Sequence, residues 1–322
     1  MLDKKQTILI TGGTGFAGSH LVEALLELGY SNIHVTAFRD QAGFLNDLLG
    51  NEHIHALDLT DHEQTKALLN KLQPQQIYHL ASLANVGNSF KQQQFILETH
   101  LKLQLNILDA VKECCPKARL LSVGSALEYQ DSDQKLDENA PLGPTNPYAL
   151  SKMIQDFLSY SYSQSEKLDI VRVRPFNHIG ERQALGFAVS DFAHEIVQIE
   201  RGQSEVMKVG NLSTIRDLTD VKDVVRAYIL LMNQGVSAEV YNVGSGIGYS
   251  MQEVLDKLIA LAKVDIKLET DPALLRPSDR PILICDNKKI KNLAWDTQYS
   301  LDATLERVLN WWRKQADQSE ER

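Results

Sequence analysis

Tyr148 and Lys152 are the side chains of this sequence whose types and spacing best suit acid–base chemistry. They stand four positions apart, which places them on one face of a helix if the segment is helical. A free tyrosine has a pKa of about 10. A neighbouring ammonium group that lowers it by about 2 or 3, roughly 3–4 kcal/mol, would let the phenol exchange protons near neutral pH. Such a pair also occurs by chance, so its surroundings in the chain have to support it.

Two features near the pair give that support. Pro147 suits the first turn of a helix that starts there. Ser125 follows the apolar run 119–123, which has the pattern of a buried strand, and open α/β sheets bind ligands at the carboxyl ends of their strands. The Ser125 hydroxyl is therefore predicted to hold a substrate carbonyl. The expected catalytic residues are Ser125, Tyr148 and Lys152.

A glycine-rich run near the N-terminus predicts a phosphate-binding loop. Its glycines directly follow the expected strand 7–10. They let the chain turn tightly and let a pyrophosphate approach the start of the next helix, whose dipole favours the anion. A plain turn is the alternative, but the position between strand and helix favours a dinucleotide site. The residues expected to bind it are Gly12, Thr14, Gly15, Phe16, Ala17 and Gly18.

The end of the second expected strand bears on the choice of dinucleotide. Arg39 there can pair with the 2′-phosphate of NADP(H) and stack on adenine. Asp40 is the competing feature, because an acidic residue at this place binds the ribose 2′-hydroxyl of NAD(H). NADP(H) is favoured, with NAD(H) as the alternative. Asp58 and Leu59 are expected to meet the adenine ring.

Short apolar runs alternate with amphipathic stretches through the first half of the chain. This β-α-β-α order predicts an α/β fold with a doubly wound, Rossmann-like parallel sheet. Beyond Pro175 two helices are expected, near 189–201 and over 221–232, and the strand 239–243 is expected to return to the main sheet. The other expected strands are 7–10, 32–36, 76–80, 119–123 and 170–173.

Composition narrows the class of protein. The 322 residues carry a net charge of −9, which argues against binding to nucleic acid or an anionic membrane. Cys114, Cys115 and Cys285 are odd in number and lack zinc-site spacing, so neither a disulfide framework nor a metal site is expected. No apolar run approaches the ~18 residues of a membrane span. A cytoplasmic protein with reduced thiols is predicted.

Taken together, the glycine loop, Ser125, Tyr148 and Lys152 resemble the extended short-chain dehydrogenase/reductases that act on nucleotide sugars. The resemblance covers nearly the whole chain. It is closest to the GDP-mannose branch and, within it, to the GDP-4-dehydro-6-deoxy-D-mannose reductases, which make GDP-D-rhamnose. The motifs that carry this closer match are Arg174-Pro175-Phe176-Asn177-His178-Ile179-Gly180, Lys208–Leu212, Arg216–Val221 and Arg276-Pro277-Ser278-Asp279.

The resemblance implies further roles. Lys152 would also hydrogen-bond the nicotinamide ribose, and Tyr148 would lie beside it. The other cofactor-binding residues implied are Leu80, Ala81, Ser82, Phe176 and His178. The substrate-binding residues implied, besides Ser125, are Asn177, Arg182, Arg216, Arg276, Ser278 and Asp279. Guanidinium groups suit a diphosphate, although a solvated surface arginine is the alternative for each of them.

The chain length and the order of its elements predict two domains, and the resemblance implies a dimer. Residues 1–175, plus about 212–245, would bind the dinucleotide. Residues 176–211 and 246–322 would form a smaller, mostly helical nucleotide-sugar domain. Members of the family commonly form homodimers through the long helix before Cys114 and the Tyr148 helix. Departures from the family pattern are His100, Leu103, Gln130 and Glu181, and His100 is expected to serve packing rather than catalysis.

One position separates reduction from dehydration. The related 4,6-dehydratases carry a glutamate that removes the C5 proton, and Leu127 stands at its place. If the run is extended, Glu128 points to the other side, because side chains alternate along a strand. A keto-sugar reductase is therefore the leading hypothesis. An epimerase or dehydratase that recycles its dinucleotide is the second, and a non-catalytic dinucleotide-binding regulator is the third.

Overall fold

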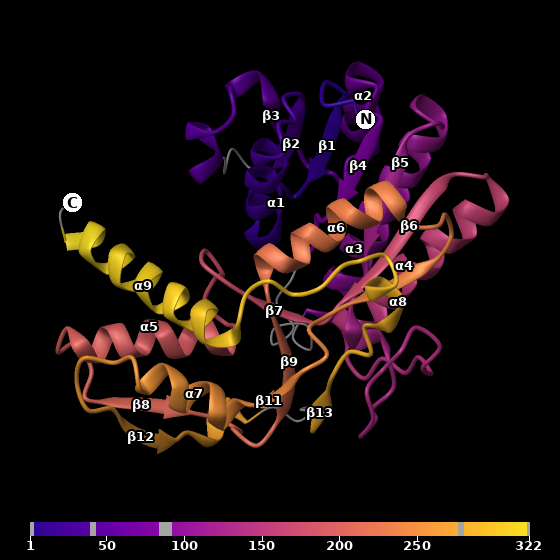
Figure 1. Cartoon of the computed structure of the whole chain (residues 1–322). Helices are drawn as coiled ribbons and strands as arrows, with labels where there is room; N and C mark the ends of the chain where they lie inside the picture. Colours follow the sequence, from indigo (N-terminus) through magenta and orange to yellow (C-terminus); the bar gives the residue numbers. More distant parts are fainter. Residues whose placement is uncertain (1–2, 39–42, 84–91, 276–279, 321–322) are drawn as a thin grey trace.

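A seven-stranded parallel sheet forms the centre of the computed structural model, which describes residues 3–38, 43–83, 92–275 and 280–320 (Figure 1). The strand order is β10-β6-β5-β4-β1-β2-β3. The sheet confirms the predicted doubly wound α/β fold, and β10 makes the predicted return to it. The strands are β1 (Ile8–Thr11), β2 (Ile33–Ala37), β3 (Ile54–Ala56), β4 (Gln76–His79), β5 (Arg119–Val123), β6 (Asp169–Pro175) and β10 (Val240–Val243).

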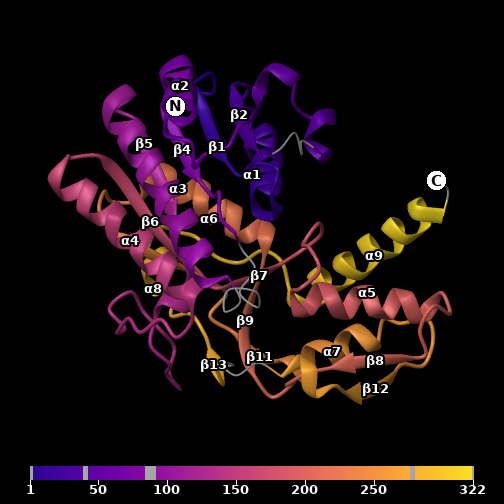
Figure 2. The ribbon, with the colours of Figure 1, turned by 180° about the vertical axis from the view of Figure 1, so that it is seen from behind.

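Helices cover both faces of this sheet (Figures 1 and 2). One layer consists of α1 (Phe16–Glu27) and α6 (Val221–Gln234), which pack against each other. The other layer consists of α2 (His62–Leu72), α3 (Gln93–Cys114) and α4 (Pro147–Ser165), in which each helix packs on the next.

The side chains of each strand alternate between these two layers. Ile8 and Ile10 of β1 belong to the core beneath α1 and α6, whereas Leu9 belongs to the core beneath α2 and α3. All three are fully buried, as a parallel sheet covered on both faces requires.

Local capping explains where two of the helices begin. The Asp61 carboxylate accepts a hydrogen bond from the Gln64 amide at the start of α2. At the start of α4, the Asn146 side chain accepts from the Ala149 amide at 2.8 Å, and Pro147 occupies the first turn. This cap fixes the position of Tyr148 on the first turn of α4.

The second half of the chain contains two small sheets that the sequence pattern did not predict. One is the path β11-β9-β13, with β7 pairing β9 beside it, and the other is the pair β12-β8. Strands such as β11 and β12 contain no fully buried residue, so they lack the apolar runs by which the equally short strands of the main sheet were recognised. The bounds are β7 (Asn177–Ile179), β8 (Val206–Val209), β9 (Ile215–Asp220), β11 (Gly248–Ser250), β12 (Lys267–Thr270) and β13 (Ile282–Leu283).

Three helices, α5 (Ala188–Glu200), α7 (Met251–Ile259) and α9 (Leu301–Glu320), share a separate core with β7, β8 and β9. The short α8 (Lys288–Lys291) packs against β10. Although β9 falls within the stretch expected to return to the main sheet, it pairs only with strands of the small sheet, and α6 and β10 make the return. Within the described ranges, no helix has the length and apolar character needed to cross a bilayer.

Candidate active site

The predicted catalytic residues Ser125, Tyr148 and Lys152 come from two neighbouring elements at the carboxyl end of the sheet. Lys152 is 4% exposed, and its ammonium group donates a hydrogen bond to the Val123 carbonyl at the end of β5 (3.0 Å). Burial lowers the pKa of Lys152 to about 8, and the Glu128 carboxylate opposes that change. Near neutral pH this lysine is therefore charged, but it loses its proton more readily than a lysine in water.

Tyr148 does not have the lowered pKa that the sequence led us to expect. Burial raises the pKa of its phenol above 10, and the Glu128 carboxylate adds to the effect. The Lys152 ammonium donates its hydrogen bond to the Val123 carbonyl rather than to the phenol. Burial therefore favours the protonated phenol at Tyr148.

The Ser125 segment is not extended, so the premise used to orient Glu128 is wrong. Residues Ala126–Glu128 form one turn of 3-10 helix that Ser125 caps. The Ser125 oxygen accepts from the Leu127 amide at 3.1 Å, and the Ser125 amide donates to the Glu128 carboxylate at 2.6 Å. This reciprocal capping box fixes the serine at the end of β5. The spacing Ser-x-x-Glu is visible in the sequence and was the signal that would have revealed it.

Glu128 also belongs to a buried charge network below the catalytic pair. Its carboxylate is fully buried and accepts from the Arg174 guanidinium at 3.1 Å. Arg174 donates in turn to Asp156 at 2.6 Å, and Arg172 donates to the same carboxylate oxygen at 3.0 Å. Burial raises the pKa of Glu128, and the neighbouring Asp156 adds to this while Arg174 opposes it. Sequence reasoning missed this network, because its members are scattered over β6, α4 and the turn after β5.

The glycine loop has the close contacts that a dinucleotide cradle requires. A Cβ at Gly18 would lie 2.3 Å from the Gly12 carbonyl oxygen, and a Cβ at Gly12 would lie 2.9 Å from the Ala81 backbone. Gly12 also has a φ of +67°, which favours glycine. Gly15 caps α1, so Thr14, Phe16 and Ala17 surround the amino end of that helix. The backbone can therefore approach a pyrophosphate here, and these residues fit the implied cofactor.

Other predicted cofactor residues lie along the same edge of the sheet. Leu80, Ala81 and Ser82 follow β4 directly. The His178 ring stacks on Phe16 at 5.7 Å, which brings β7 to the start of α1. Phe176 is 2% exposed and packs in the small core that contains Tyr129.

The residues predicted to meet adenine lie at the start of α2. Asp58 accepts hydrogen bonds from the amide and hydroxyl of Thr60, and Leu59 is buried. Arg39 and Asp40 lie outside the described residues.

The predicted substrate residues are less closely grouped. Asn177 is exposed on β7, and Arg216 is half-buried on β9 with its guanidinium on the Ile215 carbonyl. Arg182 lies beside the glycine loop, where it pairs with Glu23 at 2.5 Å and bonds Ser19 at 3.1 Å. The remaining three, Arg276, Ser278 and Asp279, lie outside the described residues.

The departures from the family pattern have structural partners. Leu103 is buried in α3, and the Gln130 amide donates to the Pro141 carbonyl. The Glu181 carboxylate accepts from Arg307 of α9 at 3.2 Å. His100 is completely buried, as predicted for a packing residue, and it is also hydrogen-bonded on both sides of its ring.

Comparisons with known proteins agree with this geometry. The chain is 27% identical to the GDP-6-deoxy-D-mannose reductase of Pseudomonas aeruginosa, over 95% of this chain and 97% of that protein. The structure of RMD from P. aeruginosa complexed with NADPH superposes with a TM-score of 0.83 at 26% identity and covers 97% of this chain and 100% of that one. A UDP-glucose 4-epimerase of Thermus thermophilus in complex with NAD gives 0.84 at 25% identity, over 95% and 99% of the two chains.

The family model described as GDP-mannose 4,6 dehydratase matches residues 9–308, which span the glycine loop, the catalytic pair and most of the second half of the chain. The predicted resemblance is thereby confirmed: this chain belongs to the GDP-mannose 4,6 dehydratase family.

Proposed function

We propose that this chain uses NADPH to reduce the C4 carbonyl of a nucleotide-linked 4-keto-6-deoxy sugar, converting GDP-4-dehydro-6-deoxy-D-mannose to GDP-D-rhamnose. The observation that carries the proposal is the combination of Ser125, Tyr148 and Lys152 at one sheet edge with Leu127 at the place of the dehydratase glutamate. The P. aeruginosa relatives, a GDP-6-deoxy-D-mannose reductase and an RMD complexed with NADPH, support the substrate and the cofactor.

The side chains divide the work of such a reduction. The Leu127 amide occupies a lone pair of the Ser125 oxygen, so the hydroxyl hydrogen points elsewhere and is available to the substrate carbonyl. When bound, NADPH supplies the hydride for the carbonyl carbon. Tyr148 holds its proton because its pKa is raised, and the alkoxide that develops on the sugar is a stronger base than a phenolate. Tyr148 therefore acts as the general acid, while Lys152 holds the nicotinamide ribose.

Glu128 does not substitute for the missing dehydratase base. Its carboxylate is fully buried, accepts from the Ser125 amide and is paired with Arg174, so it lacks the exposure to substrate that proton abstraction needs. Reduction is therefore still favoured over dehydration, but the reason is the burial and pairing of Glu128 and not its direction on an extended strand.

The proposal keeps the division of labour expected from the sequence. Residues 1–175 with α6 and β10 serve the dinucleotide, and most of 176–211 and 246–322 serves the nucleotide sugar; β9, expected in the first group, pairs with strands of the second. The three free cysteines support a cytoplasmic location, where thiols stay reduced.

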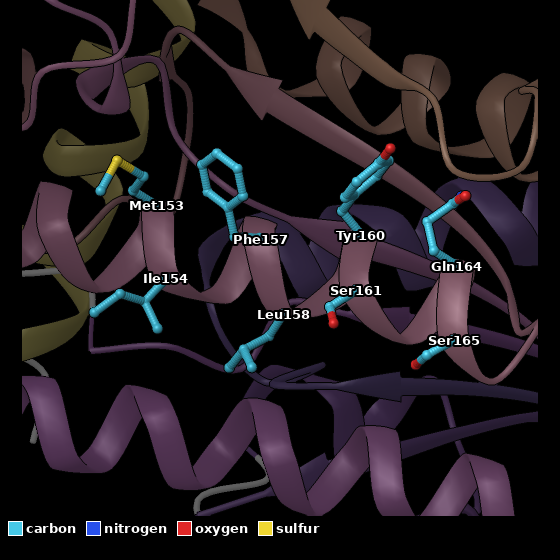
Figure 3. Close-up of a pocket in the computed structure, with 8 residues that line it drawn as sticks. All are labelled: Met153, Ile154, Phe157, Leu158, Tyr160, Ser161, Gln164 and Ser165. Carbon is cyan, nitrogen blue, oxygen red and sulfur yellow. The ribbon is translucent and has the colours of Figure 1, made fainter.

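A homodimer is part of the same proposal. The outer side of α4 carries Phe157 at 53% exposure and Tyr160 at 43%, which line a groove of about 810 Å³ (Figure 3). Met153, Phe157 and Tyr160 point to the same side of the helix in this view. A second copy that presents the same face would bury these rings in a bundle of α3 and α4 with their counterparts.

The test is turnover with defined sugars. Purified protein with NADPH and GDP-4-dehydro-6-deoxy-D-mannose should consume one NADPH per sugar, and NMR should show the D-rhamnose configuration. The GDP, UDP and dTDP forms of the keto sugar would rank the bases. No NADPH oxidation with any of them would overturn the proposal, and turnover of GDP-mannose without added reductant would point to the dehydratase instead.

A further inference from the structure

We propose that His100 is a positioning residue: as a neutral imidazole it ties the cofactor-facing segment after β4 to the catalytic helix α4. The inference rests on the proposed reductase function, and it assigns a role to a residue at which this chain departs from its family.

The hydrogen bonds around His100 define its tautomer. The Ser151 hydroxyl donates to the Tyr148 carbonyl at 2.7 Å, so its single hydrogen is used. His100 Nδ1, 2.6 Å from the same hydroxyl oxygen, must then be the donor of that second bond. On the other side of the ring, Nε2 accepts from the Leu83 amide at 2.9 Å. Both bonds require the same neutral form, with the proton on Nδ1.

The surroundings keep His100 in that form. The residue is completely buried, and burial together with the nearby Lys152 and His79 lowers the pKa of His100 to about 3. The hydrogen bonds and the burial thus both favour the neutral imidazole.

We call the hydrogen bonds of the His100 ring a bridge with two arms: the first holds Ser82 and Leu83, and the second holds Ser151. The two arms reach different parts of the site. Through Leu83, and through Ser82 at 3.2 Å, the ring holds the segment that follows β4. That segment is fixed on its other side by Thr11, whose hydroxyl accepts from the Ala81 amide at 3.2 Å next to the glycine loop. The first arm therefore positions a wall of the proposed dinucleotide site.

The second arm reaches the general acid. Ser151 connects His100 to the carbonyl of Tyr148, and the His100 and Tyr148 rings meet edge-on with centroids 5.9 Å apart. The His100 carbonyl also accepts from Gln155 one turn further along α4. This arm therefore sets the first turns of α4 against α3 and fixes where the phenol lies.

Two substitutions separate the arms. In His100→Asn the amide nitrogen can replace Nδ1 and keep the Ser151 bond, but nothing reaches the Leu83 amide. In His100→Gln the longer side chain can place an acceptor near Nε2, but the donor to Ser151 is lost. We expect His100→Asn to weaken NADPH binding about tenfold with little change in kcat, and His100→Gln to lower kcat about tenfold with little change in NADPH binding.

The measurements are the Kd of NADPH by fluorescence and the single-turnover rate of NADPH oxidation with saturating keto sugar. Ser151→Ala removes the second arm alone, so its loss of rate should not add to that of His100→Gln in the double variant. His62→Asn, a partly exposed histidine at the start of α2, is the matched control. Thermal melting of each variant reports folding, and Ser82→Ala probes the first arm should His100→Asn fail to fold.

A split between the two parameters supports the bridge. Equal losses of both parameters in both variants, additive losses in the double variant, or no change in either would overturn it. The Kd measurement needs no sugar, so it tests the first arm even if the wild-type protein proves inactive on the keto sugar. That inactivity would count against the proposed function alone.

Discussion

Helix α4 has a polar inner face and an apolar outer face, the reverse of the usual arrangement in a surface helix. Its inner face buries Lys152, Asp156 and Ser159, while its outer face exposes Phe157 and Tyr160. Most helices turn their apolar side inward, because burial of a polar group costs free energy unless it is paired.

The inner face offsets much of that cost because most of its polar groups have partners, although Oδ1 of Asp156 and Oε1 of Gln155 have none among the described residues. Lys152 bonds the Val123 carbonyl, Asp156 pairs with two arginines, and Ser159 donates to Ser122 at 2.8 Å. The outer face has no comparable cover within the described part of the chain, and the proposed second copy would supply one. The inner face of α4 thus serves the proposed chemistry, whereas its outer face is available to the proposed second copy.

The largest effect should follow from removal of a single hydroxyl group, that of Tyr148. Tyr148→Phe keeps the ring but deletes the general acid, so we expect kcat for reduction of the keto sugar to fall by about 10²–10⁴-fold. The Kd of NADPH, measured by fluorescence, should change less than about twofold. A variant that keeps more than a tenth of the wild-type rate would exclude Tyr148 as the acid.

A second change at the inner face should affect stability. Asp156→Ala leaves Arg172 and part of Arg174 without a buried counter-charge, so the free energy of unfolding should fall by about 3–5 kcal/mol in urea titrations. Gln164→Ala on the outer face is the control and should stay within about 0.5 kcal/mol. Similar losses in the two variants would mean that the faces do not differ as described.

The outer face should respond through assembly. About half of the Phe157 ring is exposed in the single chain and would be covered by the second copy. Phe157→Asp removes this apolar contact from both copies and places two like charges in the interface, so the dimer dissociation constant should rise at least about tenfold. Val236→Asp, a 59% exposed apolar residue after α6, is the matched control. Sedimentation at micromolar concentration would measure both. A monomeric wild-type protein would refute the proposed interface.

The sequence predicted those parts of the fold and site that depend on local pattern. Short apolar runs, separated by amphipathic stretches, identified strands of the main sheet. Pro147 marked the start of α4, and the glycine spacing marked the turn before α1. These features depend on neighbouring residues, whose periodicity and turn chemistry are visible in the chain.

Features that depend on tertiary surroundings were missed. The raised pKa of Tyr148 follows from its burial, which a local run of residues does not reveal. The pairing of Arg174 with Asp156 and Glu128 joins three separate elements. Glu128 was misjudged for a local reason, because a strand was assumed where Ser125 caps a turn of 3-10 helix.

The smallest predicted effect concerns pH and tests how far Glu128 acts on the inner face. Burial lowers the pKa of Lys152 to about 8, so an activity that needs its ammonium form should decline as the pH rises through about 8, and Lys152→Met should abolish this limb. Glu128 raises that pKa by its charge; its removal in Glu128→Gln should therefore move the limb to lower pH, with a few-fold loss of kcat/KM at pH 8. Burial raises the pKa of Tyr148 and so moves its own titration away from this limb, to higher pH. Profiles of kcat/KM between about pH 6 and 9 would measure the shift, and a limb that stays in place or moves upward would show that Glu128 fixes Ser125 without tuning Lys152.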